Sequence, residues 1–217
     1  GAGTSGRLGV LDASECPPTF NTSPDMVVGL IAGGYQALTR SIEGAEDHPE
    51  YGERDLQEIQ LSGKDVVVGI ATSGRTPYVI GGLRYANEVG AFTIGFSCNE
   101  ACELSRIANV MITPIVGPEV ISGSTRLKAG TATKLVLNIL TTGAMVRIGK
   151  TFGNLMVDLR ATNSKLTLRS RRIVAELTGL DATAASKLLD DCGGEVKTAI
   201  VSQLRSSSPE VARQLLH

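Results

Sequence analysis

The chain has 217 residues, a formal net charge of −1 and a hydrophobic content of 42%. This length suits one α/β domain with a small addition, while the near-neutral charge and the 4% of aromatic residues exclude a basic or base-stacking surface for nucleic acid. The apolar stretch at residues 135–146 is too short for a membrane span, which needs ~20 residues.

Cysteine and histidine usage argues against a structural metal. The four cysteines include one close pair, Cys98 and Cys102, and neither of the two histidines lies near it. We therefore expect no zinc site, two small core residues at this pair, and a reduced chain in the cytoplasm.

The chain opens on a glycine loop, Gly1-Ala2-Gly3-Thr4-Ser5-Gly6-Arg7, followed by a helix predicted at residues 8–14. Glycines permit tight turns and close approach to a ligand, and the hydroxyls and helical N–H groups can bind an anion. Pro17 and Pro18 are expected to end this helix near Glu15. Because a loop of this type normally follows a strand, we expect that an N-terminal segment with the first strand is missing.

Two further loops share this chemistry. The tetrapeptide Thr-Ser-Gly-Arg recurs at residues 72–75 after a predicted strand, and Ser122-Gly123-Ser124-Thr125 precedes the longest predicted helix, at residues 126–148. Ser124 or Thr125 is expected to cap that helix. Three hydroxyl-rich loops that each open a helix predict one phosphate cradle.

The remaining elements alternate between strands and helices. The strands are too apolar to have a solvated face, so the pattern predicts a parallel sheet with helices on both sides. Strands are expected at residues 26–32, 66–71, 92–97 and 110–115. Helices are expected at residues 35–42, 52–59, 77–89, around Cys102, and at 161–178. A turn is expected at Gly153-Asn154. Short amphipathic helices at 182–192, 195–203 and 209–216 predict a small appendage, with a boundary between 172 and 180.

The glycine loop also fits a dinucleotide-binding fingerprint through Gly1, Gly3 and Gly6. That fingerprint requires a carboxylate ~20 residues further on, at the end of the second strand. The predicted strand instead ends Ile31-Ala32-Gly33-Gly34, which argues against NAD. Glycines that serve only tight turns are the other alternative, and the repeated tetrapeptide argues against it.

Several charged residues are candidates for chemistry. Glu15, Glu43 and Glu46 are possible acid or base groups, although Glu46 lies in an acidic run that could simply be solvated. The cations Arg75, Arg126 and Lys128 could neutralise a phosphate or could be ordinary surface charges.

Long motifs resemble those of the bacterial N-acetylmuramic acid 6-phosphate etherase family. The resemblance covers nearly the whole chain. It rests on residues 1–19, Leu30-Ile31-Ala32-Gly33-Gly34, Glu43-Gly44-Ala45-Glu46-Asp47, residues 73–79 and residues 152–158. It implies a flavodoxin-like three-layer α/β/α sandwich, the sugar isomerase (SIS) domain, at residues 1–172. It also implies a small helical bundle similar to a ubiquitin-associated domain at residues 173–217.

The resemblance implies cleavage of the D-lactyl ether of N-acetylmuramic acid 6-phosphate, without metal or redox cofactor, by a homodimer. Glu46 is implied as the base at C2 and Glu15 as the acid toward lactate. The implied phosphosugar-binding residues are Thr4, Ser5, Gly6, Ser73, Gly74, Thr76, Ser122 and Ser124. A non-catalytic phosphosugar-sensing module, as in proteins related to the glucokinase regulator, is the alternative, and the presence of both glutamates favours the enzyme.

Overall fold

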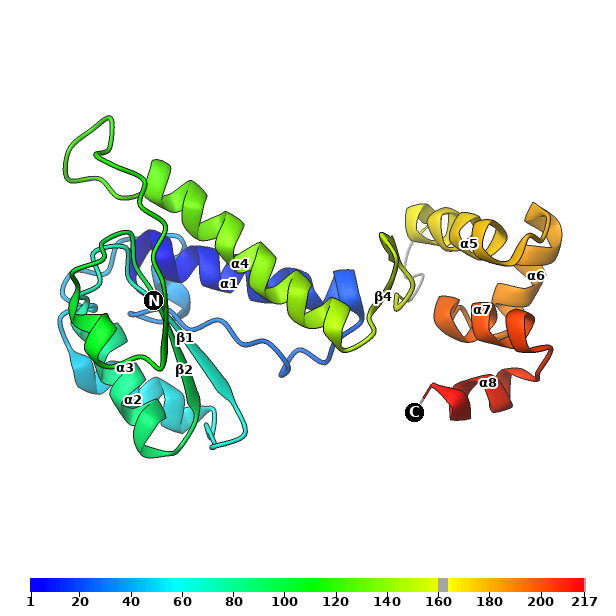
Figure 1. The fold of residues 1–217 in the computed structure, drawn as a ribbon, viewed down its shortest axis with the longest axis horizontal. Helices are drawn as coiled ribbons and strands as arrows, with labels where there is room; N and C mark the ends of the chain where they lie inside the picture. Colours follow the sequence, from blue (N-terminus) through cyan, green and yellow to red (C-terminus); the bar gives the residue numbers. More distant parts are fainter. Residues whose placement is uncertain (160–163, 217) are drawn as a thin grey trace. The chain divides into compact units, whose positions relative to one another are not determined.

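The computed structural model describes residues 1–159 and 164–216, which divide into two units (Figure 1). The first unit comprises Gly1–Ser14 and Val27–Leu140, and the second comprises Glu15–Met26 and the described part of Thr141–His217. Two long helices, α1 (Gly3–Phe20) and α4 (Lys128–Arg147), contribute residues to both units.

A parallel sheet lies at the centre of the first unit. Strands β1 (Val66–Ile70), β2 (Phe92–Phe96) and β3 (Val110–Ile112) pair in the order β1-β2-β3. The β-branched and aromatic residues of these segments favour strands, and the first two strands confirm the prediction. The third ends at Ile112 rather than at residue 115, and Pro114, which lacks an N–H, cannot continue a ladder.

Two layers of helix lie on one face of this sheet. Helix α3 (Pro77–Glu88) packs on β1, where Gly69 lies so close to Val79 and Leu83 that a β-carbon would clash with them. Helix α2 (Pro49–Glu58) packs in turn on α3, and Gly52 and Gly81 allow the two backbones to approach each other closely.

The opposite face is covered by the other two helices of the first unit (Figure 1). Leu8 of α1 and Leu137 of α4 pack with Ile70 of β1 and Phe96 of β2. Since helices cover both faces of a parallel sheet, the predicted α/β sandwich is confirmed.

The first helix is longer than predicted. It begins at Gly3 rather than at residue 8, and it includes Pro17 and Pro18 in its last turn instead of ending near Glu15. The prolines remove N–H donors only within this final turn, and Asn21 N–H still bonds to Pro17 O at 2.9 Å. The positive φ of Asn21 then ends the helix.

Two predicted elements after α1 are wrong. Residues 26–32 form no strand. Within the described part of the chain, this segment makes two backbone hydrogen bonds with Gly1: the Gly1 amino group donates to Leu30 O, and Ala32 N–H donates to Gly1 O. The helix expected at 35–42 is a single 3₁₀ turn, η1 (Tyr35–Leu38). Arg7 donates to Leu38 O and Arg40 O, so those carbonyls are used by the side chain rather than by a longer helix.

The other loops of the first unit agree with the sequence in outline. The short helix expected around Cys102 is the 3₁₀ turn η2 (Glu103–Arg106). Helix α4 begins at Lys128, and neither Ser124 nor Thr125 caps it; the carboxylate of Glu119 does so.

The second unit contains a hairpin and four further helices within the described residues. Strands β4 (Thr151–Phe152) and β5 (Leu155–Met156) flank the turn expected at Gly153-Asn154, although the strands themselves were not predicted. The helices are α5 (Ser164–Thr178), α6 (Ala182–Asp191), α7 (Val196–Arg205) and α8 (Pro209–Leu215). They match the predicted tail, and the part of the expected 161–178 helix at 161–163 lies outside the described residues.

A separate core holds this second unit together. Val157 and Leu159 pack with Val174 of α5, Leu189 of α6 and Val196 of α7, and all five are buried. The expected boundary between 172 and 173 falls inside α5.

Among the described helices, none combines the length and apolarity that crossing a bilayer requires. Over the same residues no three His, Cys, Asp or Glu side chains gather as a metal ion would require. The four cysteines are free thiols.

Candidate functional site

The loop between β1 and α3 is the centre of the candidate site. Gly74 adopts a positive φ of 69°, donates to Ala71 O at 2.8 Å, and so turns the chain sharply at the end of the strand. Ser73 and Thr76 are partly buried, and Thr76 is the residue before α3, whose first residue is Pro77. The loop therefore presents hydroxyls at the N-terminus of a helix, where an anion is stabilised.

Hydrogen bonds from the end of β2 and from η2 hold this loop in place. Cys98 N–H donates to Thr72 O at 2.9 Å, and the buried hydroxyl of Ser97 donates to the same oxygen at 3.2 Å. Leu104 N–H donates to Gly74 O at 3.1 Å. A β-carbon on Gly74 would clash with Cys102 and Ser97, so only glycine fits. Sequence reasoning missed Ser97, and its signal was a serine directly after a buried strand of a parallel sheet.

The first glycine loop meets the same end of β1. A β-carbon on Gly1 would lie 3.0 Å from Ile70 O, so Gly1 lies directly beside the last residue of that strand. Thr4, Ser5 and Gly6 occupy the first turns of α1 rather than a free loop, with Thr4 partly buried and Ser5 only 8% exposed. The structure thus brings these residues and Ser73–Thr76 to one strand end.

Glu46 is held at the start of α3. Its carbonyl oxygen accepts a hydrogen bond from Tyr78 N–H at 3.0 Å, and its neighbour Ala45 is buried with Ala71 and Tyr78. The Glu46 side chain itself is exposed. This hydrogen bond therefore fixes the backbone of Glu46 next to the helix that Ser73–Thr76 opens, and the Glu46 side chain there is accessible.

Glu15 lies on α1 and is exposed. It belongs to the second unit, whereas Glu46 and the hydroxyl loops belong to the first.

The third hydroxyl loop connects β3 to α4. Ser122 is exposed and Ser124 is partly buried in this loop. Glu119, from the same loop, accepts hydrogen bonds from Lys128 N–H at 2.9 Å and from Ala129 N–H at 3.0 Å. These bonds, that from Ala129 first, hold the pKa of Glu119 below its usual value. Sequence reasoning missed this residue because a cap nine residues before the helix leaves no local pattern.

The cations differ in availability. Arg7 is committed to the carbonyls of Leu38 and Arg40. Arg75 is exposed and has no hydrogen bond or ion pair within the described residues, so it is available to an anion.

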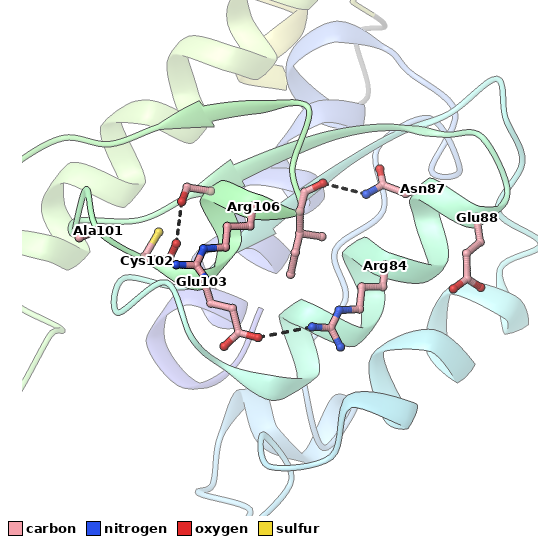
Figure 2. Close-up of a pocket in the computed structure, with 9 residues that line it drawn as sticks. Arg84, Asn87, Glu88, Ala101, Cys102, Glu103 and Arg106 are labelled. Atoms are coloured by element: carbon pink, nitrogen blue, oxygen red, sulfur yellow. Dashed lines mark hydrogen bonds and ion pairs between the residues drawn. The ribbon is translucent and has the colours of Figure 1, made fainter.

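Two hollows open on the surface of the first unit. One of about 820 Å³ lies between α3 and η2 and contains none of the predicted site residues; Figure 2 shows the Arg84–Glu103 ion pair that lines it, with an N···O distance of 3.5 Å. The other, of about 550 Å³, is lined by Gly33, Gly34, Glu43, Gly44 and Ala45 together with residues of α2. It directly adjoins Glu46 in the chain, so it is the better candidate for part of a sugar site.

Comparison with known proteins identifies the family of the chain. The sequence profile of the glucokinase regulatory protein N-terminal SIS domain matches residues 1–87. A protein of Rhodopirellula baltica named N-acetylmuramic acid 6-phosphate etherase is 69% identical over 216 residues, which cover 100% of this chain and 72% of that protein. The protein of that name from Rhizobium rhizogenes is 59% identical, with 100% and 70% covered, and N-acetylmuramic acid 6-phosphate etherase 1 of Vibrio cholerae is 57% identical, with 100% and 72% covered. High identity along the whole chain confirms the resemblance read from the motifs, and the chain belongs to the N-acetylmuramic acid 6-phosphate etherase family.

Proposed function

We propose that the chain is a lyase that converts N-acetylmuramic acid 6-phosphate to N-acetylglucosamine 6-phosphate and D-lactate, in the recycling of cell-wall sugars. The structural observation that carries the proposal is the hydrogen bond from Tyr78 N–H to Glu46 O, which fixes the backbone of Glu46 beside the loop of Ser73–Thr76. A base and a phosphate-binding loop are two of the parts that this chemistry needs; the third is an acid for the departing lactate.

The reaction follows from the acidity of the sugar. Ring opening places an aldehyde at C1, which makes the C2 proton removable because the resulting anion is delocalised onto the carbonyl oxygen. We assign removal of this proton to Glu46. The C3–O bond of the lactyl ether then breaks, and Glu15 donates a proton to the departing lactate oxygen. Water adds to C3 of the resulting double bond while C2 regains a proton, so no electrons are gained or lost and no cofactor is needed. Paired carboxyl groups in different environments can supply one base and one acid near neutral pH.

The phosphate of the substrate is assigned to the hydroxyl loops. Thr4, Ser5 and Gly6 at the start of α1 and Ser73, Gly74 and Thr76 before α3 adjoin one strand end, which supports a shared anion site. Ser122 and Ser124 are assigned a secondary part from the loop before α4.

The organisation of the whole protein is also a proposal. Residues 1–172 are assigned to the phosphosugar domain and 173–217 to the helical bundle, with the limit inside α5. Four free thiols suit the cytoplasm. We further expect a homodimer and no nucleic-acid partner.

The alternative is a phosphosugar sensor without catalysis. It has one observation in its favour, the profile match to a regulatory SIS domain at residues 1–87. The relatives named as etherases match along the entire chain, and both glutamates are present, so the enzyme is the better proposal.

The test is lactate release and C2 exchange in the same set of variants. Glu46→Gln removes the base, so both lactate release and exchange of C2–H of N-acetylglucosamine 6-phosphate in D₂O should fall by ~10²–10⁴-fold. Glu15→Gln should stop lactate release and leave exchange intact, because exchange needs no leaving group. Glu53→Gln, which changes an exposed carboxylate of α2 that lines neither hollow, is the matched control. Exchange lost in Glu15→Gln and retained in Glu46→Gln would reverse the two roles.

A further inference from the structure

The carboxylate of Glu119 occupies the place where the N-terminus of α4 would bind an anion. Its two oxygens accept from the N–H groups of Lys128 and Ala129, the first two residues of the helix, at 2.9 and 3.0 Å. Free N–H groups of a first turn and the helix dipole favour a negative charge at this point. Here the protein supplies that charge itself, so α4 differs from α1 and α3.

The same contact fixes the loop between β3 and α4. Glu119 lies in that loop and bonds to residues nine and ten positions later, which closes the segment that carries Ser122 and Ser124. The first turn of α4 lies beside the first hydroxyl loop, since a β-carbon on Gly130 would be 3.6 Å from Cγ2 of Thr4. An anion bound to α4 would therefore compete with one bound at the start of α1.

We propose that Glu119 is a positioning residue that closes the N-terminus of α4 to the substrate phosphate, and so directs the phosphate to the N-termini of α1 and α3. The inference rests on the proposed function, in which a phosphosugar binds at these loops. In this proposal Glu119 does not contact the substrate. It accepts hydrogen bonds from the N–H groups of Lys128 and Ala129 and so holds the Ser122–Ser124 segment in place.

The experiment is an amide NMR titration with inorganic phosphate on the chain of residues 1–217. In the unmodified protein we expect amide signals of Ser73–Thr76 and Thr4–Gly6 to shift on saturation, while those of Lys128 and Ala129 stay unchanged. In Glu119→Ala the two amides of α4 are released, so they should shift as well, with phosphate binding there at least ~10-fold more tightly than in the unmodified chain. Glu119→Gln, which keeps a neutral acceptor, should give a smaller response, and it serves as the test if Glu119→Ala does not fold.

Glu88→Ala is the matched control, because it removes one exposed carboxylate from α3. It should leave the amides of Lys128 and Ala129 unresponsive. Turnover gives a second readout: phosphate held at α4 keeps the sugar away from Glu46, so kcat and KM for lactate release should fall together in Glu119→Ala.

Two outcomes overturn different conclusions. Saturable shifts of Lys128 and Ala129 amides in the unmodified protein would mean that phosphate displaces Glu119, and would end this inference while leaving the phosphosugar site intact. Shifts at none of the three helix starts, with inorganic phosphate and with N-acetylglucosamine 6-phosphate, would instead contradict the proposed function.

Discussion

Arg7 and Arg75 occupy the same position in two Thr-Ser-Gly-Arg tetrapeptides but have different surroundings. Arg7 lies on α1 and donates to Leu38 O at 3.0 Å and Arg40 O at 3.1 Å, so it holds the η1 segment against the helix. Arg75 follows Gly74 in a sharp turn and is exposed. The repeat therefore supplies hydroxyls twice and an available cation once.

Ser73 permits a direct test of the phosphate assignment. Hydrogen bonds to charged groups are worth ~1.5–3 kcal/mol, so Ser73→Ala should weaken binding of N-acetylglucosamine 6-phosphate by ~10- to 100-fold. Calorimetric titration measures this change. Ser105→Ala is the control, because it removes a hydroxyl from η2 that donates to Cys102 O, away from the predicted phosphate loops. An unchanged dissociation constant for Ser73→Ala would remove Ser73 from the site.

At the scale of elements, the contact between α2 and α3 determines where Glu46 lies. Gly52 of α2 approaches Tyr78 of α3 so closely that a β-carbon would clash with the Tyr78 carbonyl. The same Tyr78 holds Glu46 through its N–H and donates its hydroxyl to Asp55 Oδ2 at 2.7 Å. Burial, followed by this bond, raises the pKa of Tyr78, so its hydroxyl stays protonated as a donor.

Substitution of Gly52 should therefore damage both stability and activity. Gly52→Ala forces α2 and α3 apart, and overpacking of this kind costs ~1–3 kcal/mol. We expect a lower Tm and reduced lactate release. Gly143→Ala is the matched control, because this glycine also lies inside a helix and a β-carbon there meets no atom within 4 Å. Alanine at 143 should raise stability by ~0.5–1 kcal/mol; an equal loss in both variants would contradict the packing argument.

The turn before β1 should make stability depend on pH. Asp65 accepts from Ser62 N–H and from Ser62 Oγ, both at 2.8 Å, and these bonds lower its pKa in the folded state. A carboxyl group with a lowered folded pKa stabilises the fold above its unfolded pKa, and the contribution is lost as pH falls through the folded value. The Tm difference between the unmodified chain and Asp65→Asn should thus be present at pH 7. It should shrink as the pH falls below 3.8, the ordinary pKa of an aspartate.

Thermal unfolding across this pH range measures the effect. Ser62→Ala, which removes one of the two donors, should reduce the acid-dependent part of the difference. A Tm difference for Asp65→Asn that stays constant into the acid range would show that the hydrogen bonds to Ser62 do not carry it.

The elements that sequence predicted well are those with strong local patterns. The apolar runs at β1 and β2 and the periodic helices α3 and α4 were found because their signals lie within each segment. The failures depend on distant partners. The segment at 26–32 needs a paired neighbour to be a strand, η1 is shortened by Arg7 from another helix, and Glu119 caps α4 from nine residues away. For the site, the sequence motifs predicted Ser73 and Glu46. The hydrogen bond from Tyr78 N–H to Glu46 O and the one from the Ser97 hydroxyl to Thr72 O could not be predicted, because they join residues far apart in the chain.

At the scale of the whole molecule, the exposed face of α4 bears on assembly. In the first unit, Leu135 and Ile139 of this helix are 56% and 70% exposed and lie four residues apart, on one face. Burial of apolar surface stabilises association by ~25 cal/mol per Å², so a second copy that covers this face would gain from both side chains. This agrees with the homodimer that the family resemblance implies.

We expect a homodimer in solution, and Ile139 tests which face is used. Light scattering after size exclusion should give the mass of two chains at high micromolar concentration, and Ile139→Glu should shift the chain toward monomer, because a buried unpaired carboxylate is costly. Leu204→Glu, at a residue of α7 that is 60% exposed, is the matched control and should leave the mass unchanged. A monomer mass for the unmodified chain would contradict the dimer itself. A dimer that persists in Ile139→Glu and is lost in Leu204→Glu would place the interface on the helical bundle instead of on α4.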